Sequence, residues 1–220
     1  IITILNKMKK EELPEIIPVF PLNNFIMFPK STVPLNIFEP RYIQMIDESM
    51  QGKRLVGMIQ PKKTGKLKKP DLYNIGCMGK ITSFNETEDG RYLIILNGIC
   101  RFKIIDEIQN EKIFRECNID FNEYTDDLTN TPKDKNFSNL NLIFNQMKQL
   151  FKKQGYIINW KDMEKQNLDQ IINTLSMASP FSLEEKQILL ESKNIDSRIK
   201  KLEEIIKTYS SDNFNNTTIQ

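Results

Sequence analysis

Few side chains in this chain of 220 residues could carry out covalent or metal chemistry. Histidine is absent, which removes the usual general base near neutral pH and the Ser-His and Cys-His nucleophile pairs. The three cysteines, Cys77, Cys100 and Cys117, contain no C-x-x-C pair, and this argues against a thiolate zinc site and against a disulfide framework. These residue types predict a protein that is not an enzyme and that binds no cofactor or metal.

The Gly65-Lys66 pair is the candidate for a phosphate-binding loop. A Walker A loop needs Ser or Thr after the lysine and a glycine five residues before the second glycine, but this chain has Leu67 and Gln60 there. An ATPase is therefore not predicted. The pair lies in the densest basic cluster of the chain, and these lysines either form a solvated loop or contact RNA phosphates. The cluster comprises Lys62, Lys63, Lys66, Lys68 and Lys69.

Glu39, Arg41 and Tyr42 bring an acid, a base and a phenol together at the predicted start of a helix. An acid and a base two residues apart more often form a structural pair, and a carboxylate also favours the positive end of a helix. We interpret these three residues as fixing the helix beside a binding surface, with no catalytic role.

Aromatic and proline residues are dense between residues 18 and 38. One interpretation is a barrel core closed by proline-bounded strands. The other is an exposed apolar groove for extended or unfolded segments, with Phe25, Met27 and Phe28 as its contacts. The sequence leaves both interpretations open, because it does not decide which side chains face solvent.

Elements that could position these residues follow from the patterning. Residues 16–122 are predicted to be β-rich, and a helix over 39–50 is predicted from its apolar spacing, with Pro40 in the first turn and Gly52 past the end. Asp89-Gly90 and Asn97-Gly98 are typical of tight turns, since Gly and Asn tolerate positive φ.

The two turn dipeptides predict a meander with strands over 76–86, 91–96 and 99–108. Residues 91–96 are mostly apolar on both faces, which predicts a central strand.

The remaining chain divides by composition. Residues 1–15 are an N-terminal extension, 123–136 have the polar composition of a linker, 137–208 show helical periodicity, and 209–220 form a polar tail predicted to be disordered. The fold class is therefore α+β.

The net charge and the hydropathy limit the partners and the location. A formal net charge of +2 gives no general field that would attract nucleic acid or an anionic membrane. No apolar run is long enough to span a bilayer, and the start lacks a secretory signal, so a cytoplasmic protein without membrane contact is predicted.

Short motifs rich in Pro, Gly and aromatic residues recur along the β-rich part. They are Ile17-Pro18-Val19-Phe20-Pro21-Leu22, Pro34-Leu35-Asn36-Ile37-Phe38-Glu39-Pro40-Arg41-Tyr42, Leu55-Val56-Gly57-Met58-Ile59-Gln60-Pro61, Gly76-Cys77-Met78-Gly79-Lys80-Ile81-Thr82-Ser83-Phe84 and Asn97-Gly98-Ile99-Cys100-Arg101-Phe102. In type and order they resemble the Lon protease N-terminal, substrate-binding domain family over residues 16–207, in particular its free-standing bacterial members without ATPase or peptidase domains.

The resemblance implies a small PUA-like twisted β-barrel followed by a C-terminal α-helical bundle. It also implies binding of unfolded or degron-bearing proteins, with an adaptor or modulator role toward a AAA+ protease. The chain departs from the family at Lys30, where the family commonly has Gly after Phe-Pro, and this leaves the geometry of the following loop open. An RNA-binding PUA-like protein, using the lysine cluster at 62–69, is the alternative.

Overall fold

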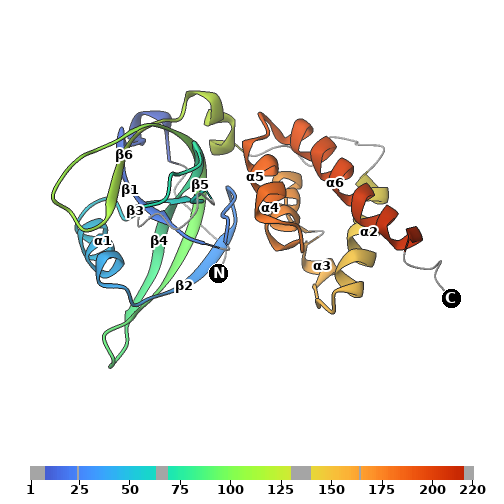
Figure 1. The fold of residues 1–220 in the computed structure, drawn as a ribbon, viewed down its shortest axis with the longest axis horizontal. Coiled ribbons are helices and arrows are strands. Elements are labelled where there is room, and N and C mark those ends of the chain that lie inside the picture. Colours follow the sequence, from blue (N-terminus) through green and yellow to red (C-terminus); the bar gives the residue numbers. More distant parts are fainter. Residues whose placement is uncertain (1–7, 24, 63–68, 130–139, 164, 216–220) are drawn as a thin grey trace. The chain divides into compact units, whose positions relative to one another are not determined.

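A computed structural model describes residues 8–23, 25–62, 69–129, 140–163 and 165–215, with side chains described through residue 209. The chain divides into two compact units, Ile1–Thr129 and Asn130–Gln220. Figure 1 shows the first as β-rich and the second as helical, which confirms the α+β class. Among the described residues, no helix has both the length and the apolar composition needed to cross a membrane.

The β-rich unit is built on one mixed sheet with the strand order β2-β5-β4-β3-β1-β6. Because β6 also pairs with β5, five strands form a closed ring of pairings, and β2 lies outside it beside the first half of β5. The β1–β3 pairing is parallel, with Val19 opposite Gly57. The strands are β1 (Ile16–Pro21), β2 (Thr32–Ile37), β3 (Leu55–Ile59), β4 (Ile75–Glu86), β5 (Tyr92–Glu107) and β6 (Arg115–Asp120), and a short 3₁₀ helix, η1 (Lys10–Glu12), precedes them.

The predicted helix is confirmed as α1 (Pro40–Gln51), with proline in its first turn. Its buried face carries Tyr42, Met45 and Ile46. The Tyr42 ring packs on the ring of Phe20 in β1, with 4.1 Å between centroids, so the apolar stripe anticipated from the spacing attaches the helix to the strands.

The Asp89-Gly90 turn is confirmed, since Gly90 has φ 77° in the β4–β5 hairpin. The predicted turn at Asn97-Gly98 is wrong, because β5 runs through it without interruption. Glycine is needed at 98 for space, because a Cβ there would lie 2.2 Å from the carbonyl oxygen of Phe28. The predicted strands over 91–96 and 99–108 are therefore one strand, β5. At Gly98 it packs against the loop between β1 and β2 that contains Phe28, which we call the Phe28 loop.

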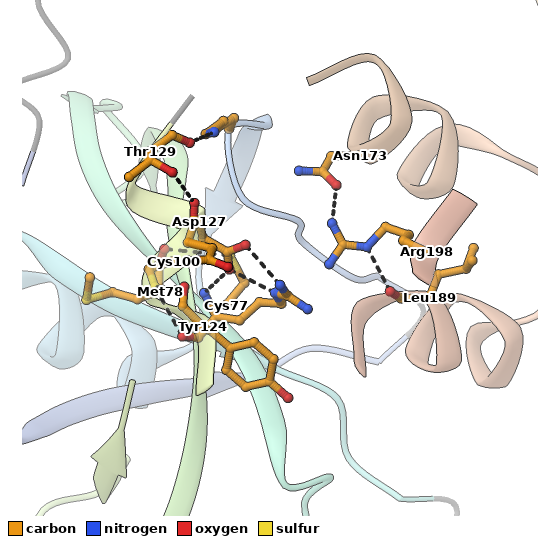
Figure 2. A network of polar contacts seen from close by, with 12 residues as sticks. Cys77, Met78, Cys100, Tyr124, Asp127, Thr129, Asn173, Leu189 and Arg198 are labelled. Carbon is orange, nitrogen blue, oxygen red and sulfur yellow. Dashed lines mark hydrogen bonds and ion pairs between the residues drawn. The ribbon is translucent and has the colours of Figure 1, made fainter. Parts of the chain in front are cut away.

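The first half of the predicted linker is folded. Residues Asn122–Leu128 form a 3₁₀ helix, η2, which packs against β5 through a buried ion pair. The Nε atom of Arg101 donates to Asp127 Oδ2 at 2.8 Å, and Nη2 donates to Asp127 Oδ1 at 2.9 Å. The Cζ atom of the Arg101 guanidinium lies 4.3 Å from the centroid of the Tyr124 ring. Figure 2 labels Tyr124 and Asp127 in this network. Composition does not reveal this segment, because tertiary contacts hold it, among them the Arg101–Asp127 ion pair and the packing of Tyr124 on Arg101.

The helical unit contains five helices within the described residues. Ser182 and Glu185, three residues apart as a capping box requires, form that box at the start of α5. Arg198 is buried, donating through Nε to the Leu189 carbonyl at 2.9 Å and through Nη1 to Asn173 Oδ1 (Figure 2). The last helix runs to Asn215, into the predicted tail. The helices are α2 (Leu140–Lys153), α3 (Trp160–Met163), α4 (Leu168–Ala178), α5 (Leu183–Glu191) and α6 (Ile195–Asn215).

Replacing Gly98 with alanine should destabilise the β-rich unit by about 3 kcal/mol, because the new methyl group would overlap a backbone oxygen. Gly90→Ala is the matched control, since a Cβ there meets nothing within 4 Å and should cost only about 1 kcal/mol for its positive φ. Hydrogen exchange of the β4 and β5 amides measures both losses. Equal losses for the two variants would contradict the close approach at Gly98.

Replacing Asp127 with alanine should lower the free energy of unfolding by about 3 kcal/mol, because it leaves the charge of buried Arg101 without its carboxylate. The neighbouring Asp126 is exposed, so Asp126→Ala should change stability by less than about 0.5 kcal/mol. Urea unfolding followed by circular dichroism compares the two variants. Similar losses for both would show that η2 is not held by this ion pair.

Candidate functional site

The loop that carries the predicted apolar contacts is packed into the β-rich unit. Phe25 is half-buried, whereas Met27 and Phe28 are buried, with 1% and 0% of their surface exposed. The Met27 methyl lies so close to Gly79 that a Cβ there would be 2.9 Å away. In this conformation Met27 and Phe28 therefore serve the core, and a direct contact between either one and a partner has no structural support.

Lys30 stabilises the conformation of the Phe28 loop. Its φ is 61°, in the left-handed region where glycine is favoured, so this lysine takes up the conformation that a glycine would adopt more easily. Its backbone N–H donates to the Gly98 carbonyl at 2.8 Å, and its ammonium donates to the Thr129 carbonyl. These hydrogen bonds fix the loop against β5 and the end of η2.

Glu39, Arg41 and Tyr42 lie together, as expected, at the start of α1. The Arg41 Nη2 and Glu39 Oε2 atoms are 2.7 Å apart in an exposed ion pair, and the guanidinium lies 4.5 Å from the Tyr42 ring centroid. Tyr42 is buried and its hydroxyl donates to the Pro21 carbonyl at 3.2 Å. Tyr42 thus positions the helix on β1, and Phe38, with 65% of its surface exposed, precedes the ion pair.

The predicted lysine cluster is only partly described, because Lys63, Lys66 and Lys68 lie outside the described residues. Lys62 lies 6.0 Å from the Tyr73 ring centroid. Lys69 forms an ion pair with Glu107 at 2.7 Å. The described lysines therefore contact neighbouring side chains of the β-rich unit.

A pocket of about 280 Å³ lies beside these lysines. Its most buried charges neutralise each other, since Arg115 Nη2 and Glu107 Oε2 are 2.6 Å apart. The buried Cys117 also lines it. The described residues that line the pocket therefore include no unbalanced charge and no activated nucleophile.

An apolar surface lies instead on the outer face of β5. Leu93 and Ile95 alternate with the buried Ile94 and Leu96, and 44% and 37% of their surfaces are exposed. Pro34 of β2 is exposed opposite Ile95. We call Pro34, Leu93 and Ile95 the β5 surface.

The cross-strand neighbours of Leu93 and Ile95 on β4 and of Leu93 on β2 are polar and uncharged. Asn36 and Asn85 flank Leu93, and Ser83 pairs with Ile95; all three are exposed. The sequence contained a sign of this exposed apolar face, because residues 91–96 are mostly apolar on both faces of the strand. It predicted a central strand, which the pairing of β5 with both β2 and β4 confirms, but it did not show that one face of this part of β5 is exposed to solvent.

The thiols are protected from chemistry by burial. All three cysteines are buried. Burial, with a smaller effect of the Asp127 carboxylate, raises the pKa of Cys100, and burial together with Glu107 raises the pKa of Cys117 to about 11. Among the described residues no group of three acidic or cysteine side chains could hold a metal ion.

Because the thiolate is the reactive form, the native protein should react with iodoacetamide at least about tenfold more slowly at about pH 8 than the unfolded protein does. Both the raised pKa values and burial act in this direction, and the difference should persist as the pH rises until it nears the native pKa of Cys117. Mass spectrometry of tryptic peptides measures each cysteine, with guanidinium-unfolded protein as the control. Rapid labelling of Cys100 or Cys117 in the native protein would contradict their burial.

Comparisons with known proteins agree on one family. A family model described as the ATP-dependent protease La (LON) substrate-binding domain matches residues 16–208. The Lon protease of Desulfosudis oleivorans is 28% identical over 204 residues, covering 87% of this chain and 24% of that protein. The Lon protease of Syntrophus aciditrophicus is 26% identical over 212 residues, covering 93% and 26%. The chain thus spans about a quarter of the length of these curated relatives.

Solved structures show the same fold. The Lon N-terminal domain protein from Xanthomonas campestris superposes with a TM-score of 0.59 at 18% identity, covering 87% of this chain and 97% of that one. The N-terminal domain of Mycobacterium avium complex Lon protease gives 0.58 at 14%, covering 90% and 98%. The resemblance carried by the Pro-, Gly- and aromatic-rich motifs is therefore confirmed, and this chain belongs to the Lon substrate-binding domain family.

Proposed function

We propose that this chain is a non-catalytic module that binds exposed apolar segments of other proteins through the β5 surface. The observation that carries the proposal is the solvent exposure of Leu93 and Ile95, two residues apart on one face of a strand that is paired on both sides. Membership of a substrate-binding family supports binding of protein substrates.

The chemistry of the β5 surface suits an extended, unfolded segment. Covering the exposed parts of Leu93 and Ile95 would contribute about 1–2 kcal/mol for each side chain. Asn36, Asn85 and Ser83 offer hydrogen bonds to a backbone without selecting for charge. Binding of this kind is weak and tolerant of sequence, as a module that samples many unfolded proteins requires.

The proposed contact is the exposed face of β2 and β5, and not the free edge of β2. Within the described residues β2 pairs only with β5, so its other side is an edge where a strand could add. Pro34 offers no N–H to such a strand, and proline is a common protection of edges. In this proposal a bound segment is held by side chains, and Phe38 and Arg41 are also exposed on the same unit, next to the half-buried Glu39.

A role beside a protease is supported by the relatives, which are Lon proteases. In this proposal the module holds unfolded or degron-bearing proteins and presents them to a AAA+ protease, either in the same chain or as an adaptor. The β5 surface supplies the binding step alone, since it holds no group that could cleave a peptide bond.

The double variant Leu93→Ser/Ile95→Ser should bind a reduced, carboxymethylated and therefore unfolded test protein at least about thirtyfold more weakly than the unsubstituted chain, because the apolar contact is lost. Ile105→Ser is the matched control, since Ile105 also lies on β5 with 65% of its surface exposed. Fluorescence anisotropy measures the affinity, with a short single-stranded RNA in a parallel titration.

If the double variant still bound the test protein, the proposal that the β5 surface is the binding site would be wrong. Tight RNA binding that falls steeply with salt and is lost on neutralising Lys62, Lys63, Lys66, Lys68 and Lys69 would favour the RNA-binding alternative. Degradation of the test protein by an added Lon protease reports delivery, and only the unsubstituted chain and Ile105→Ser should accelerate it.

A further inference from the structure

A second surface lies in the helical unit, where α2 meets α3. Tyr156 is 52% exposed, Ile157 is 100% exposed and Trp160 is half-buried. Isolated exposed apolar residues are normal, but three within five positions form a patch. We call Tyr156, Ile157, Trp160 and the five lysines between residues 148 and 165 the α2–α3 surface.

The backbone of this connection is fixed. Gly155 has φ 75°, and the N–H groups of Gly155 and Tyr156 donate to the carbonyls of Lys152 and Phe151 at 3.1 and 3.0 Å. This is the Schellman arrangement, and its expected apolar contact is present between the rings of Tyr156 and Phe151, 5.8 Å apart. Tyr156 and Ile157 are thus displayed by an ordered helix end.

The other side of the connection is held equally firmly. Asn159 stands before α3, and its side chain donates to Asp162 Oδ2, while the Asn159 carbonyl accepts from the Met163 N–H. Trp160 packs edge-on against Phe151, with 6.0 Å between ring centroids. Little conformational entropy would be lost when a partner covers Ile157.

The charge around these apolar side chains has one dominant sign. Between residues 148 and 165 the sequence has five lysines against two acids, Asp162 and Glu164, giving this segment a net +3 while the whole chain carries only +2. The lysines are Lys148, Lys152, Lys153, Lys161 and Lys165. The remainder of the helical unit carries a net charge of −1, so the positive charge of this unit is concentrated here.

The favourable interaction of cations with a helix dipole explains the positions of only some of these lysines. Lys152 and Lys153 lie in the last turn of α2, where a cation interacts favourably with the helix dipole. Lys161 lies in α3, a helix of only four residues, so the dipole of a longer helix does not explain its position. Lys148 lies one turn before Lys152, with its ammonium 5.3 Å from the Trp160 ring centroid.

We propose that the α2–α3 surface binds an acidic protein segment that carries apolar side chains. Ile157 and Tyr156 would take its apolar residues, and Lys148, Lys152 and Lys161 would pair with its carboxylates. The surface is distinct from the β5 surface, whose cross-strand neighbours are uncharged, so the two recognise different chemistry and this inference does not depend on the first.

Two other anionic partners fit the geometry less well. Binding of single-stranded RNA relies on open aromatic faces, whereas Trp160 is half-buried beside Phe151 and Lys148. A membrane surface needs a long amphipathic face or a second anchor for stable attachment, and three side chains on a short connection provide neither.

The test uses the full chain and a fluorescein-labelled peptide of alternating Glu and Leu residues. Trp160 is the single tryptophan of the protein, so bound peptide should change its emission as well as the anisotropy of the label. The variant Lys148→Glu/Lys161→Glu should weaken binding about tenfold, and Ile157→Ser about fivefold. Raising the salt from about 50 to about 200 mM should weaken binding by the unsubstituted chain.

Lys193→Glu/Lys200→Glu is the matched control, because it reverses two exposed lysines elsewhere in the helical unit and should leave the affinity within about twofold. A peptide of Glu and Ser should bind weakly to every variant. Circular dichroism verifies that each variant is folded.

Four results would overturn the proposal. They are equal losses in the control variant, equal binding of the Glu-Ser peptide, absence of peptide binding, and stronger binding to anionic vesicles or to RNA than to the Glu-Leu peptide. Failure here is separable from failure of the β5 surface, since Leu93→Ser/Ile95→Ser should leave Glu-Leu binding intact.

Discussion

Lack of space inside the ring of strands is the constraint on which the β-rich unit depends. A Cβ at Gly76 would come within 2.6 Å of both the Phe102 ring and the Met58 carbonyl, and one at Gly79 would lie 2.6 Å from Leu96. Large side chains from β5 therefore fill the interior opposite glycines of β4. Such interlocking allows a short ring of strands to reach the packing density of a protein core.

The same constraint determines where apolar side chains can meet solvent. The Phe28 loop closes over Gly98, and Met27 fills space beside Gly79. Met27 and Phe28 are therefore buried in the core and do not face solvent. On the far side of β5 the alternation of the strand places Leu93 and Ile95 outward. Buried Arg101 then holds η2 on β5 through Asp127, near the end of the first unit at Thr129.

The two proposed surfaces divide recognition by charge. The β5 surface is apolar with uncharged polar cross-strand neighbours, whereas the α2–α3 surface combines apolar side chains with lysines. Each sits on ordered backbone, a paired strand in one case and a capped helix end in the other. A module with both could hold an unfolded segment and an acidic segment at once, and their affinities would respond differently to salt.

The sequence by itself determined the family, the α+β class, α1, the Asp89-Gly90 turn and the capping box at Ser182, because each depends on local spacing or on motifs read in order. Tertiary structure decided the rest. Asn97-Gly98 has the composition of a turn, yet Gly98 serves the close approach of Phe28, and residues 123–128 look like a linker until Arg101 supplies a buried partner for Asp127. Which of Met27, Phe28, Leu93 and Ile95 face solvent depends on contacts between distant segments, and no local pattern contains that information.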